Sequence, residues 1–437
     1  MKRRTFLASV VRALPVLHGF PLLGSSRTAA PGGNFVEAEG EISPHDEAFW
    51  NLVREQFPLT LKRIYLNNGG LGPSPYVVLD ALQSKTVELE RISETGHSEK
   101  LWHELKEKAA RVLGATPEEI AFTRNATEGI NIVCNGLPLK RGDEVVTTSH
   151  EHVGNTITWL ARQKRDGIAV RVFEPSTQSA EETLERLVER ITPKTRVISI
   201  PHVTTTTGQI LPVKEIGEVA RRHDLWYFVD GAQAPGMMPV NVREIGCHAY
   251  ATSGHKWLLG PKGTGLLYVR QDALDRIEAR WVGAYSNVGP FDIRTGEFQF
   301  HPSAQRYEYG TVNVPLVVGL GAAMDFLLKI GLNNVWRRDH ALATALKEGL
   351  LELGVEVLSP ENSGEHSAMM TFRIPGVEYR RLQPFLASEY ALRTRGIYEA
   401  GLNAVRISLH IYNSFEEVET VLTAVEAAKQ RLVNHGR

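Results

Sequence analysis

Residues 225–236 read LWYFVDGAQAPG, and this stretch decides the fold class. The five apolar residues of 225–229 predict a strand that is buried on both faces. Similar short apolar runs recur along the chain and alternate with stretches of helical spacing. This alternation is typical of an α/β fold with a mainly parallel sheet that helices cover on both faces. Asp230 follows the run directly, and a carboxylate there needs a cationic or hydrogen-bonding partner.

The alternation extends from about Tyr65 to Pro315. Strands are expected at residues 119–123, 144–148, 169–173, 196–200, 225–229 and 265–269. Helices are expected at residues 126–134, 152–165 and 213–223. After residue 315 the pattern changes to long helical segments at 317–329 and 335–353, followed by strand-like runs at 368–373 and 404–409. We therefore expect a large α/β domain over residues 65–315 and a smaller C-terminal α+β domain over residues 316–437, with residues 31–64 packing against the small domain.

The composition excludes several classes of function. The chain of 437 residues has 49 Lys and Arg against 50 Asp and Glu, which argues against binding to nucleic acid or to a membrane surface. Two cysteines are too few for a disulfide scaffold or a structural zinc site. No apolar run reaches about 18 residues, so stable membrane insertion is not expected.

The N-terminus reads MKRRTFLASVVRALPVLHGFPLLGSSRTAA over residues 1–30. The paired Arg3 and Arg4, the weakly apolar segment and the small residues that end it resemble a twin-arginine export leader. This interpretation predicts an exported, periplasmic protein. A cytoplasmic protein with a basic tail is the alternative.

Candidate binding residues follow the ends of the predicted strands, where ligands of open α/β sheets bind. Residues 124–129, RNATEG, begin a helix whose free N–H groups and Thr127 hydroxyl favour a phosphate, although a plain helix cap is the alternative. His152 follows the next strand and is either a ring that stacks on an aromatic cofactor or a structural histidine. Lys256 lies in the stretch ATSGHKWLLGPKGTG of residues 251–265.

Together these residues fit one molecule, pyridoxal phosphate. It has a phosphate, an aromatic ring, a basic ring nitrogen, a phenolic oxygen and an aldehyde that a lysine captures. The chain supplies, in order, Thr127, His152, Asp230, Gln233 and Lys256. A lysine Schiff base with an aspartate on the pyridinium nitrogen is the usual arrangement for this cofactor.

The chain resembles the class V aminotransferase family of fold type I pyridoxal phosphate enzymes, which includes cysteine desulfurases, selenocysteine lyases and isopenicillin N epimerases. The matching stretches lie between about residues 65 and 417 and occur in family order. They are YLNNGGLGPSP (65–75), FTRNATEGINIV (122–133), SHEHVGN (149–155), HVTTTTGQILPV (202–213), VDGAQAPG (229–236), SGHKWLLGPKGTG (253–265), YGTVN (309–313) and VRISLHIYNSFEEV (405–418).

The resemblance implies roles for individual residues. Lys256 would form the Schiff base, Asp230 would contact the ring nitrogen and Gln233 the phenolic oxygen, while His152 would stack on the ring. The residues implied for the phosphate are Ala126, Thr127, Ser253 and His255, with Thr311 reaching the phosphate of a partner subunit. Arg406 would bind the substrate α-carboxylate, and Asn68 and Arg393 are further substrate-binding candidates. A homodimer with shared active sites follows from these roles, together with a small-molecule or peptide-linked amino acid substrate.

Two departures narrow the expected chemistry. Desulfurases and lyases of the family carry a reactive cysteine in the loop before the carboxylate-binding arginine, whereas residues 393–408 read RTRGIYEAGLNAVRIS. A persulfide route through a protein thiol is therefore not expected. Thr205, a further cofactor-binding candidate, stands where many relatives have asparagine. The stretches TTTTGQILPV and NAVRISLHIYNS look closest to the isopenicillin N epimerase-like branch.

The expected activity is an aminotransferase-type reaction at the Cα-amino group. The first alternative is an epimerase, for which Tyr285, Tyr398 and His410 are candidates for the second acid. The other alternative is a catalytically idle cofactor-binding protein of the periplasm. Transamination of a dicarboxylic substrate would need a second carboxylate partner, for which the candidates are Arg393, Arg395 and Arg306.

Overall fold

The computed structural model describes residue 38 and residues 40–434, so the predicted export leader lies outside the described residues. Its largest element is a seven-stranded sheet in the order β2-β8-β7-β6-β5-β3-β4. The strands are β2 (Ile120–Thr123), β3 (Glu144–Thr148), β4 (Ala169–Phe173), β5 (Thr195–Pro201), β6 (Trp226–Asp230), β7 (Ala249–Ser253) and β8 (Gly265–Val269). The predicted α/β class with a mainly parallel sheet is confirmed.

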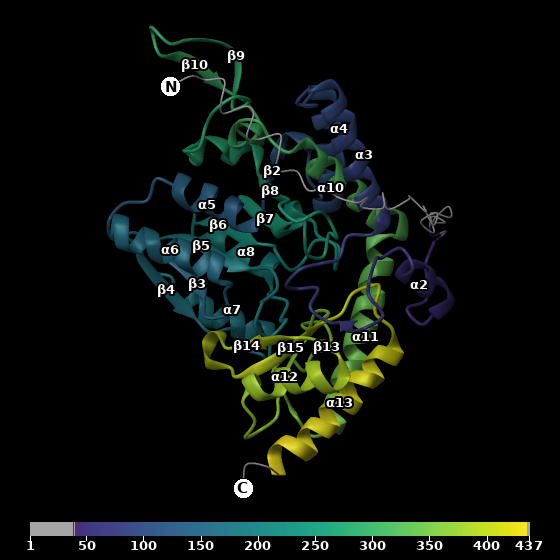
Figure 1. The fold of residues 1–437 in the computed structure, drawn as a ribbon. Coiled ribbons are helices and arrows are strands. Elements are labelled where there is room, and N and C mark those ends of the chain that lie inside the picture. The colour runs from purple at the N-terminus through teal and green to yellow at the C-terminus, as the bar shows by residue number, and fades with distance from the viewer. Residues whose placement is uncertain (1–37, 39, 435–437) are drawn as a thin grey trace, which may run out of the picture. The chain divides into compact units, whose positions relative to one another are not determined.

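Both faces of this sheet are buried, which explains the unbroken apolar strands. Along β6, Tyr227 and Val229 belong to one hydrophobic core, and Phe228 belongs to the core on the opposite face. Helices α5 (Ala126–Gly136) and α6 (Val153–Asp166) cover the Phe228 face. The opposite face is covered by α7 (Ala180–Val188), α8 (Val213–Arg222) and α9 (Val242–Ile245), as Figure 1 allows the reader to follow.

One strand departs from the predicted parallel pattern. Strands β3 to β7 are parallel to one another, but β8 pairs antiparallel with both β7 and β2. The loop of residues 254–264 between β7 and β8 contains no helix to carry the chain back across the sheet. The chain therefore turns and returns in the opposite direction. This loop contains Lys256.

The C-terminal third forms a second sheet with its own hydrophobic core. Its order is β11-β12-β15-β14, with β11 (Glu356–Val357), β12 (Met369–Arg373), β15 (Ala404–Ser408) and β14 (Arg395–Ile397). Three helices pack with it, namely α11 (Leu332–Glu352), α12 (Tyr379–Tyr390) and α13 (Phe415–Asn434). The short β1 (Ile64–Tyr65) pairs with β13 (Leu392–Arg393), so the segment before the large sheet contacts the last third of the chain. The predicted domain limits stay predictions.

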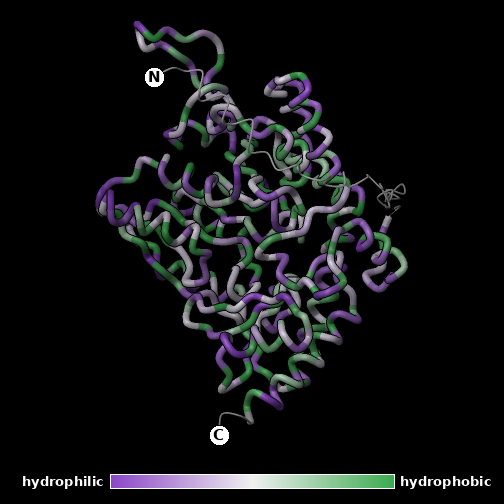
Figure 2. The backbone as a smooth tube through the Cα atoms, viewed as in Figure 1, coloured by the Kyte–Doolittle hydropathy of each residue, from purple (hydrophilic) through white to green (hydrophobic). Residues whose placement is uncertain are grey.

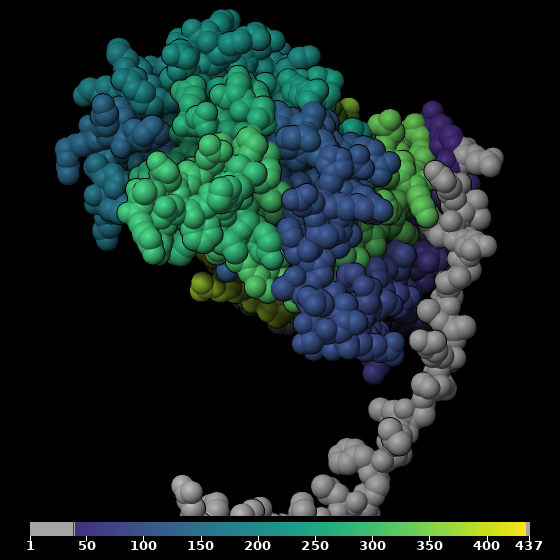
Figure 3. Space-filling view, turned by 90° about the horizontal axis from the view of Figure 1, so that it is seen from above, coloured from purple at the N-terminus to yellow at the C-terminus, as the bar shows by residue number. Residues whose placement is uncertain are grey.

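Among the described residues, three further helices precede the large sheet in the sequence, and one lies in the sequence between the strands of the two sheets. They are α2 (Glu47–Arg54), α3 (Tyr76–Ile92), α4 (Glu99–Leu113) and α10 (Val314–Ile330), and α10 packs against both α3 and α4. Figure 3 shows α3 and α4 in blue beside the green segment that leads to α10. None of the described helices is by itself long and apolar enough to span a membrane; α10 and α11 reach that length only as a pair bent by 79°.

A β-hairpin that the sequence pattern did not predict projects beyond the large sheet. It consists of β9 (Asn287–Asp292) and β10 (Glu297–Phe300), which pair only with each other. Figure 2 shows hydrophobic and hydrophilic residues mixed along it. Phe291 and Ile293 expose 71% and 89% of their surface, which is unusual for large apolar side chains that lie together.

Candidate active site

Lys256 lies three residues beyond the end of β7, in the turn that leads to β8. The turn is held by the backbone of Gly72, whose N–H donates to the His255 oxygen at 2.7 Å. The Lys256 side chain is buried, and none of the described residues lies within hydrogen-bond distance of its Nζ atom. The pKa of Lys256 is lowered to about 8, chiefly by burial; Asp230 opposes the shift, and Arg406 and Arg395 add to it. The site therefore raises the fraction of the neutral amine that a nucleophile or base requires above that of a free lysine.

Asp230 is the last residue of β6 and is buried, so it lies within the strand rather than after it as the sequence pattern suggested. One carboxylate oxygen accepts a hydrogen bond from Ala232 N at 3.0 Å. The other oxygen has no hydrogen-bond partner among the described residues. Burial raises the pKa of Asp230, while Ala232 and Lys256 oppose that rise. A protonated ring nitrogen would stabilise the carboxylate in this position.

Gln233 is fixed by contacts on both ends of its amide. Trp257 Nε1 donates to its oxygen at 2.8 Å. Its nitrogen donates to Gly69 O at 2.9 Å and to Thr205 Oγ1 at 3.4 Å. The structure therefore brings Gln233 and Thr205 together. Gln233 also connects them to Trp257, the residue that follows Lys256.

His152 is the residue before α6, and its Nδ1 accepts a hydrogen bond from Gly154 N at 3.0 Å. Burial lowers the pKa of His152 to about 4, and Lys256 and Arg395 lower it further. The ring is therefore neutral near pH 7, as stacking on a cationic pyridine ring requires. His150 contacts Ser149 Oγ at 2.9 Å instead. Among the described residues, no group of three His, Cys, Asp or Glu is placed to hold a metal ion.

Three of the residues implied for the phosphate, Ala126, Thr127 and Ser253, meet at the N-terminus of α5. Ala126 N donates to Ser253 Oγ at 3.1 Å, which joins the helix start to the end of β7. No hydrogen bond within the described chain uses the N–H or the hydroxyl of Thr127. The buried Nδ1 of His255 also lacks a partner. These unpartnered donors at a helix N-terminus fit an anion.

Arg406 lies in the middle of β15 and is completely buried. Its guanidinium donates to Thr205 O at 2.7 Å, to Thr205 Oγ1 at 3.0 Å and to Asn67 Oδ1 at 3.3 Å, while its Nε has no partner. Burial lowers the pKa of Arg406 to about 9, and Arg395 adds to the effect. Asn68 is also buried, and its side-chain nitrogen is unpartnered. The substrate-binding role of both residues stays a prediction.

Of the three arginines considered for a second carboxylate, only Arg395 lies beside Arg406. The two residues are directly paired across β14 and β15. Arg395 NH1 donates to the same Thr205 hydroxyl at 3.3 Å, and its other end pairs with Glu399. Arg393 is exposed and donates to Thr394 O, and Arg306 pairs with Asp275 at the surface.

None of the three candidates for a second acid has a described contact with the Lys256 side chain, and two of them are engaged elsewhere. Tyr285 is stacked on His97 with a centroid distance of 4.2 Å, and Tyr398 is 65% exposed. His410 is completely buried and engages both ring nitrogens, one with Asp339 and one with the Trp257 oxygen.

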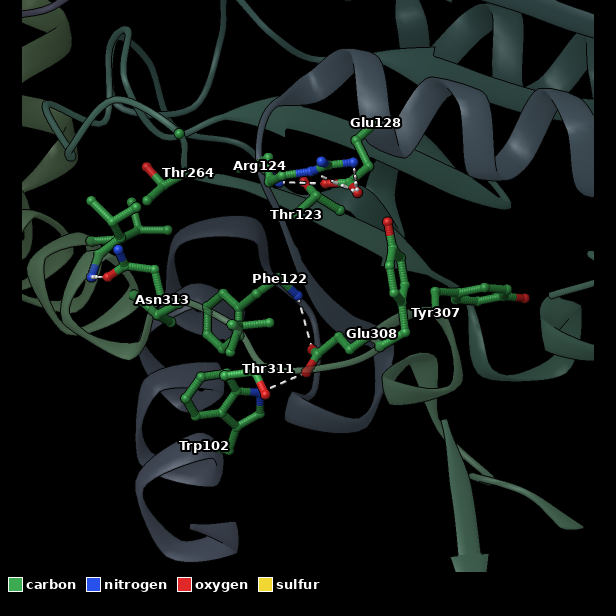
Figure 4. A pocket seen from close by; sticks show the side chains of 17 residues that line it. Trp102, Phe122, Thr123, Arg124, Glu128, Thr264, Tyr307, Glu308, Thr311 and Asn313 are labelled. Carbon is green, nitrogen blue, oxygen red and sulfur yellow. Dashed lines mark hydrogen bonds and ion pairs between the residues drawn. The ribbon is translucent and has the colours of Figure 1, made fainter. Parts of the chain in front are cut away.

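Thr311 lies apart from the Lys256 cluster. It is exposed and lines a cavity of about 380 Å³ with Phe122, Thr264 and Asn313 (Figure 4). No hydrogen bond joins Thr311 to the other candidate residues among those described. Its contact with the phosphate of a partner subunit stays a prediction.

Glu151 is a buried acid that the sequence reasoning passed over. It accepts hydrogen bonds from Thr147 Oγ1, Thr148 N, Thr148 Oγ1 and Asn155 Nδ2. Burial raises the pKa of Glu151 to about 8, and the nearby Asp230 contributes to the rise. In the stretch HEH, the sequence reasoning considered only the histidines. The signal that could have revealed Glu151 is an acidic residue in the short connection between a buried strand and the next helix.

Neither cysteine belongs to the site. Cys134 and Cys247 are completely buried. Burial raises the pKa of Cys134 to about 12 and that of Cys247 further, so neither thiol forms a reactive thiolate near pH 7.

The unpartnered groups described above fit pyridoxal phosphate. The free oxygen of Asp230 suits its ring nitrogen, and the Lys256 amine with its lowered pKa suits its aldehyde carbon. The donors of Thr127 and His255 suit its phosphate. One molecule would satisfy all of these groups.

Comparison with known proteins agrees with this assignment. The family model Aminotransferase class-V matches residues 64–421. A probable cysteine desulfurase of Pyrococcus abyssi is 28% identical, with 86% of this chain and 96% of the relative covered. The isopenicillin N epimerase of Amycolatopsis lactamdurans is 30% identical, with 86% and 98% covered.

Solved structures are similar over the same part of the chain. The apo cysteine desulfurase of Thermococcus onnurineus NA1 has a TM-score of 0.76 at 29% identity, with 86% of this chain and 97% of that chain covered. The cystine C–S lyase C-DES in complex with cysteine persulfide has a TM-score of 0.77 at 29% identity, with 85% and 99% covered. In another structure of C-DES, glycine is covalently linked to the PLP cofactor. This chain therefore belongs to the class V aminotransferase family, has the fold of fold type I enzymes, and is a pyridoxal phosphate-dependent enzyme.

Proposed function

We propose that this enzyme removes the Cα proton of an amino acid, or of a metabolite that contains one, and transfers its amino group. The observation that carries the proposal is the buried Lys256 amine, whose pKa is lowered to about 8, beside two arginines and the unpartnered carboxylate oxygen of Asp230. When bound, pyridoxal phosphate withdraws electrons from Cα and so makes its proton acidic.

In this proposal each residue has one task. Asp230 keeps a proton on the ring nitrogen, and His152 lies against the ring. Arg406 binds the substrate carboxylate through its unpartnered Nε and so orients Cα. Lys256 Nζ takes the proton from Cα.

Amino-group transfer is supported by the number of free acids and bases in the site. Transfer needs one base, which moves the proton along a single face from Cα to its new position. Epimerisation needs a second acid on the opposite face, and Tyr285, Tyr398 and His410 are stacked, exposed or engaged elsewhere. Desulfuration through a protein persulfide needs a thiol, and both cysteines are buried away from Lys256.

A C–S lyase is the second candidate, because the similar C-DES structure is that of a cystine C–S lyase with cysteine persulfide as its product. A lyase that leaves the persulfide on its product requires no thiol from the protein. It would use the same base, Lys256, and the same carboxylate anchor, Arg406.

Further parts of the proposal concern location and assembly. We retain a homodimer with shared active sites, and export to the periplasm through the predicted twin-arginine leader. The cytoplasm is the alternative. Nucleic acid has no part in the proposal.

The test begins with the absorption spectrum of purified enzyme and of Lys256→Ala. We expect a visible band of lysine-bound cofactor in the parent that is lost or displaced in the variant. In single turnovers with amino donors, transfer yields up to one keto acid per site and no free ammonia, and more keto acid forms only after an acceptor is added. A lyase instead releases ammonia and sulfane sulfur continuously from cystine. Loss of Cα hydrogen without either product would favour epimerisation, and a band that no amino compound perturbs would indicate an idle protein.

A further inference from the structure

A buried acid–histidine pair contacts the backbone next to Lys256 and has no role in the chemistry described so far. Asp339 of α11 and His410, two residues beyond the end of β15, are both completely buried. Asp339 Oδ2 lies 2.6 Å from His410 Nδ1. The other ring nitrogen, Nε2, lies 3.1 Å from the backbone oxygen of Trp257, the residue that follows Lys256.

The contact with Trp257 fixes the protonation of one ring nitrogen. A backbone carbonyl oxygen can only accept a hydrogen bond, so His410 Nε2 must carry a proton and donate it. Burial raises the pKa of Asp339 to about 6, and His410 opposes that rise. Whether the proton between Asp339 and His410 resides on oxygen or on nitrogen, the pair is neutral as a whole. Its complete burial therefore leaves no uncompensated charge.

The backbone around Lys256 is held on other sides by close contacts with glycines. A Cβ atom on Gly72 would lie 2.1 Å from the Lys256 oxygen, and one on Gly236 would lie 2.3 Å from the Trp257 oxygen. Among the described residues, His410 is the one side chain that donates to a backbone oxygen of residues 255–257. The three contacts together leave the lysine backbone little freedom to move.

We propose that Asp339 and His410 are positioning residues for Lys256: the hydrogen bond from His410 Nε2 to the Trp257 oxygen fixes the backbone from which the lysine reaches the cofactor. The inference rests on the proposed role of Lys256. Trp257 also donates its indole N–H to Gln233, so a shift of Trp257 would disturb a second cofactor-facing residue. His410 follows Arg406 by four positions (410 − 406) on one chain segment, which links the carboxylate anchor to the lysine backbone.

The test uses full-length protein from which the cofactor has been removed, with pyridoxal phosphate added back as the probe. The first measurement is the rate of cofactor capture, followed by borohydride reduction and mass spectrometry to locate the attachment at Lys256. The second is the visible circular dichroism of the bound cofactor relative to its absorbance, which reports the cofactor's orientation. Unfolding temperatures are recorded for every variant. The variants are His410→Ala, His410→Gln, Asp339→Asn and, as a control, His366→Gln.

We expect His410→Ala to slow capture at least about tenfold and to change the dichroism, because a small displacement of a reacting group is costly. His410→Gln keeps an N–H group that can reach the same oxygen, so capture should recover to within about threefold of the parent. Asp339→Asn should lie between these two variants. His366 is a buried histidine that contacts Ser367 O and His340, so His366→Gln should destabilise the protein without changing capture or dichroism.

Parent-like capture and dichroism in His410→Ala would overturn the inference, whatever its unfolding temperature. Equal slowing in His366→Gln would overturn it too, because general destabilisation would then explain the effect. If His410→Ala does not fold, Asp339→Asn decides the matter, and parent-like behaviour of that variant contradicts the proposal. A parent enzyme that captures no cofactor would instead refute the proposed role of Lys256, and the inference with it.

Discussion

Burial is the largest cause of the lowered pKa of Lys256; Asp230 opposes it, and two arginines add to it. Because each positive neighbour disfavours the ammonium form, Arg406 and Arg395 help to lower the pKa of the amine. The same two guanidiniums share the hydroxyl of Thr205, which places them side by side. One of them binds the substrate carboxylate in the proposed mechanism, and the other is paired with Glu399.

Arg395 is expected to receive a second acidic group of the substrate, which would replace Glu399 as its partner. Removal of one charge-assisted hydrogen bond costs about 1.5 to 3 kcal/mol, which corresponds to roughly 10- to 100-fold in affinity. Arg395→Ala should therefore weaken the binding of dicarboxylic amino acids by that factor and leave monocarboxylic ones within about threefold. Spectral titration of the bound cofactor measures this preference. Arg393→Ala is the control, and equal losses in both variants, or none in Arg395→Ala, would contradict the prediction.

At the scale of elements, the junction between β3 and α6 contains the buried Glu151, which lies near Asp230. Four hydrogen bonds from Thr147, Thr148 and Asn155 converge on its carboxyl group. Because burial raises its pKa from 4.5 to about 8, the folded protein holds a proton that the unfolded chain releases. Stability from this group is complete below about pH 4.5 and is lost as the pH rises to about 8.

Glu151→Gln replaces the neutral acid by an amide of the same shape that does not titrate. Relative to the parent, the variant should gain on the order of 3 to 5 kcal/mol in unfolding free energy between pH 4.5 and pH 8, from 1.36 kcal/mol per pKa unit. Urea unfolding at several pH values measures the difference. The exposed Glu94→Gln should follow the parent at every pH, and a constant difference for Glu151→Gln would show that Glu151 does not hold this proton.

The loop between β7 and β8 depends on its close approach to Gly72. A Cβ atom at that position would lie 2.1 Å from the Lys256 oxygen, closer than atoms can approach. Gly72→Ala should therefore displace the loop, cost at least about 2 kcal/mol of stability and remove the visible cofactor band. Gly364→Ala, at a position where a Cβ atom would make only an ordinary van der Waals contact of 3.5 Å with Asn362 Oδ1, should change stability by less than about 0.5 kcal/mol. Retention of a normal cofactor band in Gly72→Ala would refute the argument.

At the scale of the whole molecule, the β9–β10 hairpin exposes large apolar side chains that a monomer would leave in water. We expect a second copy of the chain to cover it. Sedimentation should then give twice the 48.6 kDa of one chain. The double variant Phe291→Asp with Ile293→Asp should weaken association at least about 100-fold. Leu61→Asp, at an isolated exposed leucine, is the control, and a monomeric parent would refute the expectation.

Local sequence patterns were sufficient for much of the fold and for the choice of cofactor. The strands predicted at residues 144–148, 169–173 and 265–269 have those bounds in the structure. A run of apolar residues between turn residues is a local signal, and both its length and its burial follow from the same residues. That Asp230 and Lys256 lie near each other could be predicted for similar reasons, because strand ends in such sheets meet at one edge, while their roles stay predictions.

The tertiary structure determined how segments that are far apart in the sequence contact one another. It gave β8 its antiparallel direction, placed Arg395 rather than Arg393 beside Arg406, and gave both nitrogens of His410 partners. One of those partners, Asp339, is 71 residues away in the sequence. No local pattern contains such information, because the direction of a strand and the partner of a buried side chain depend on which remote segments pack against them.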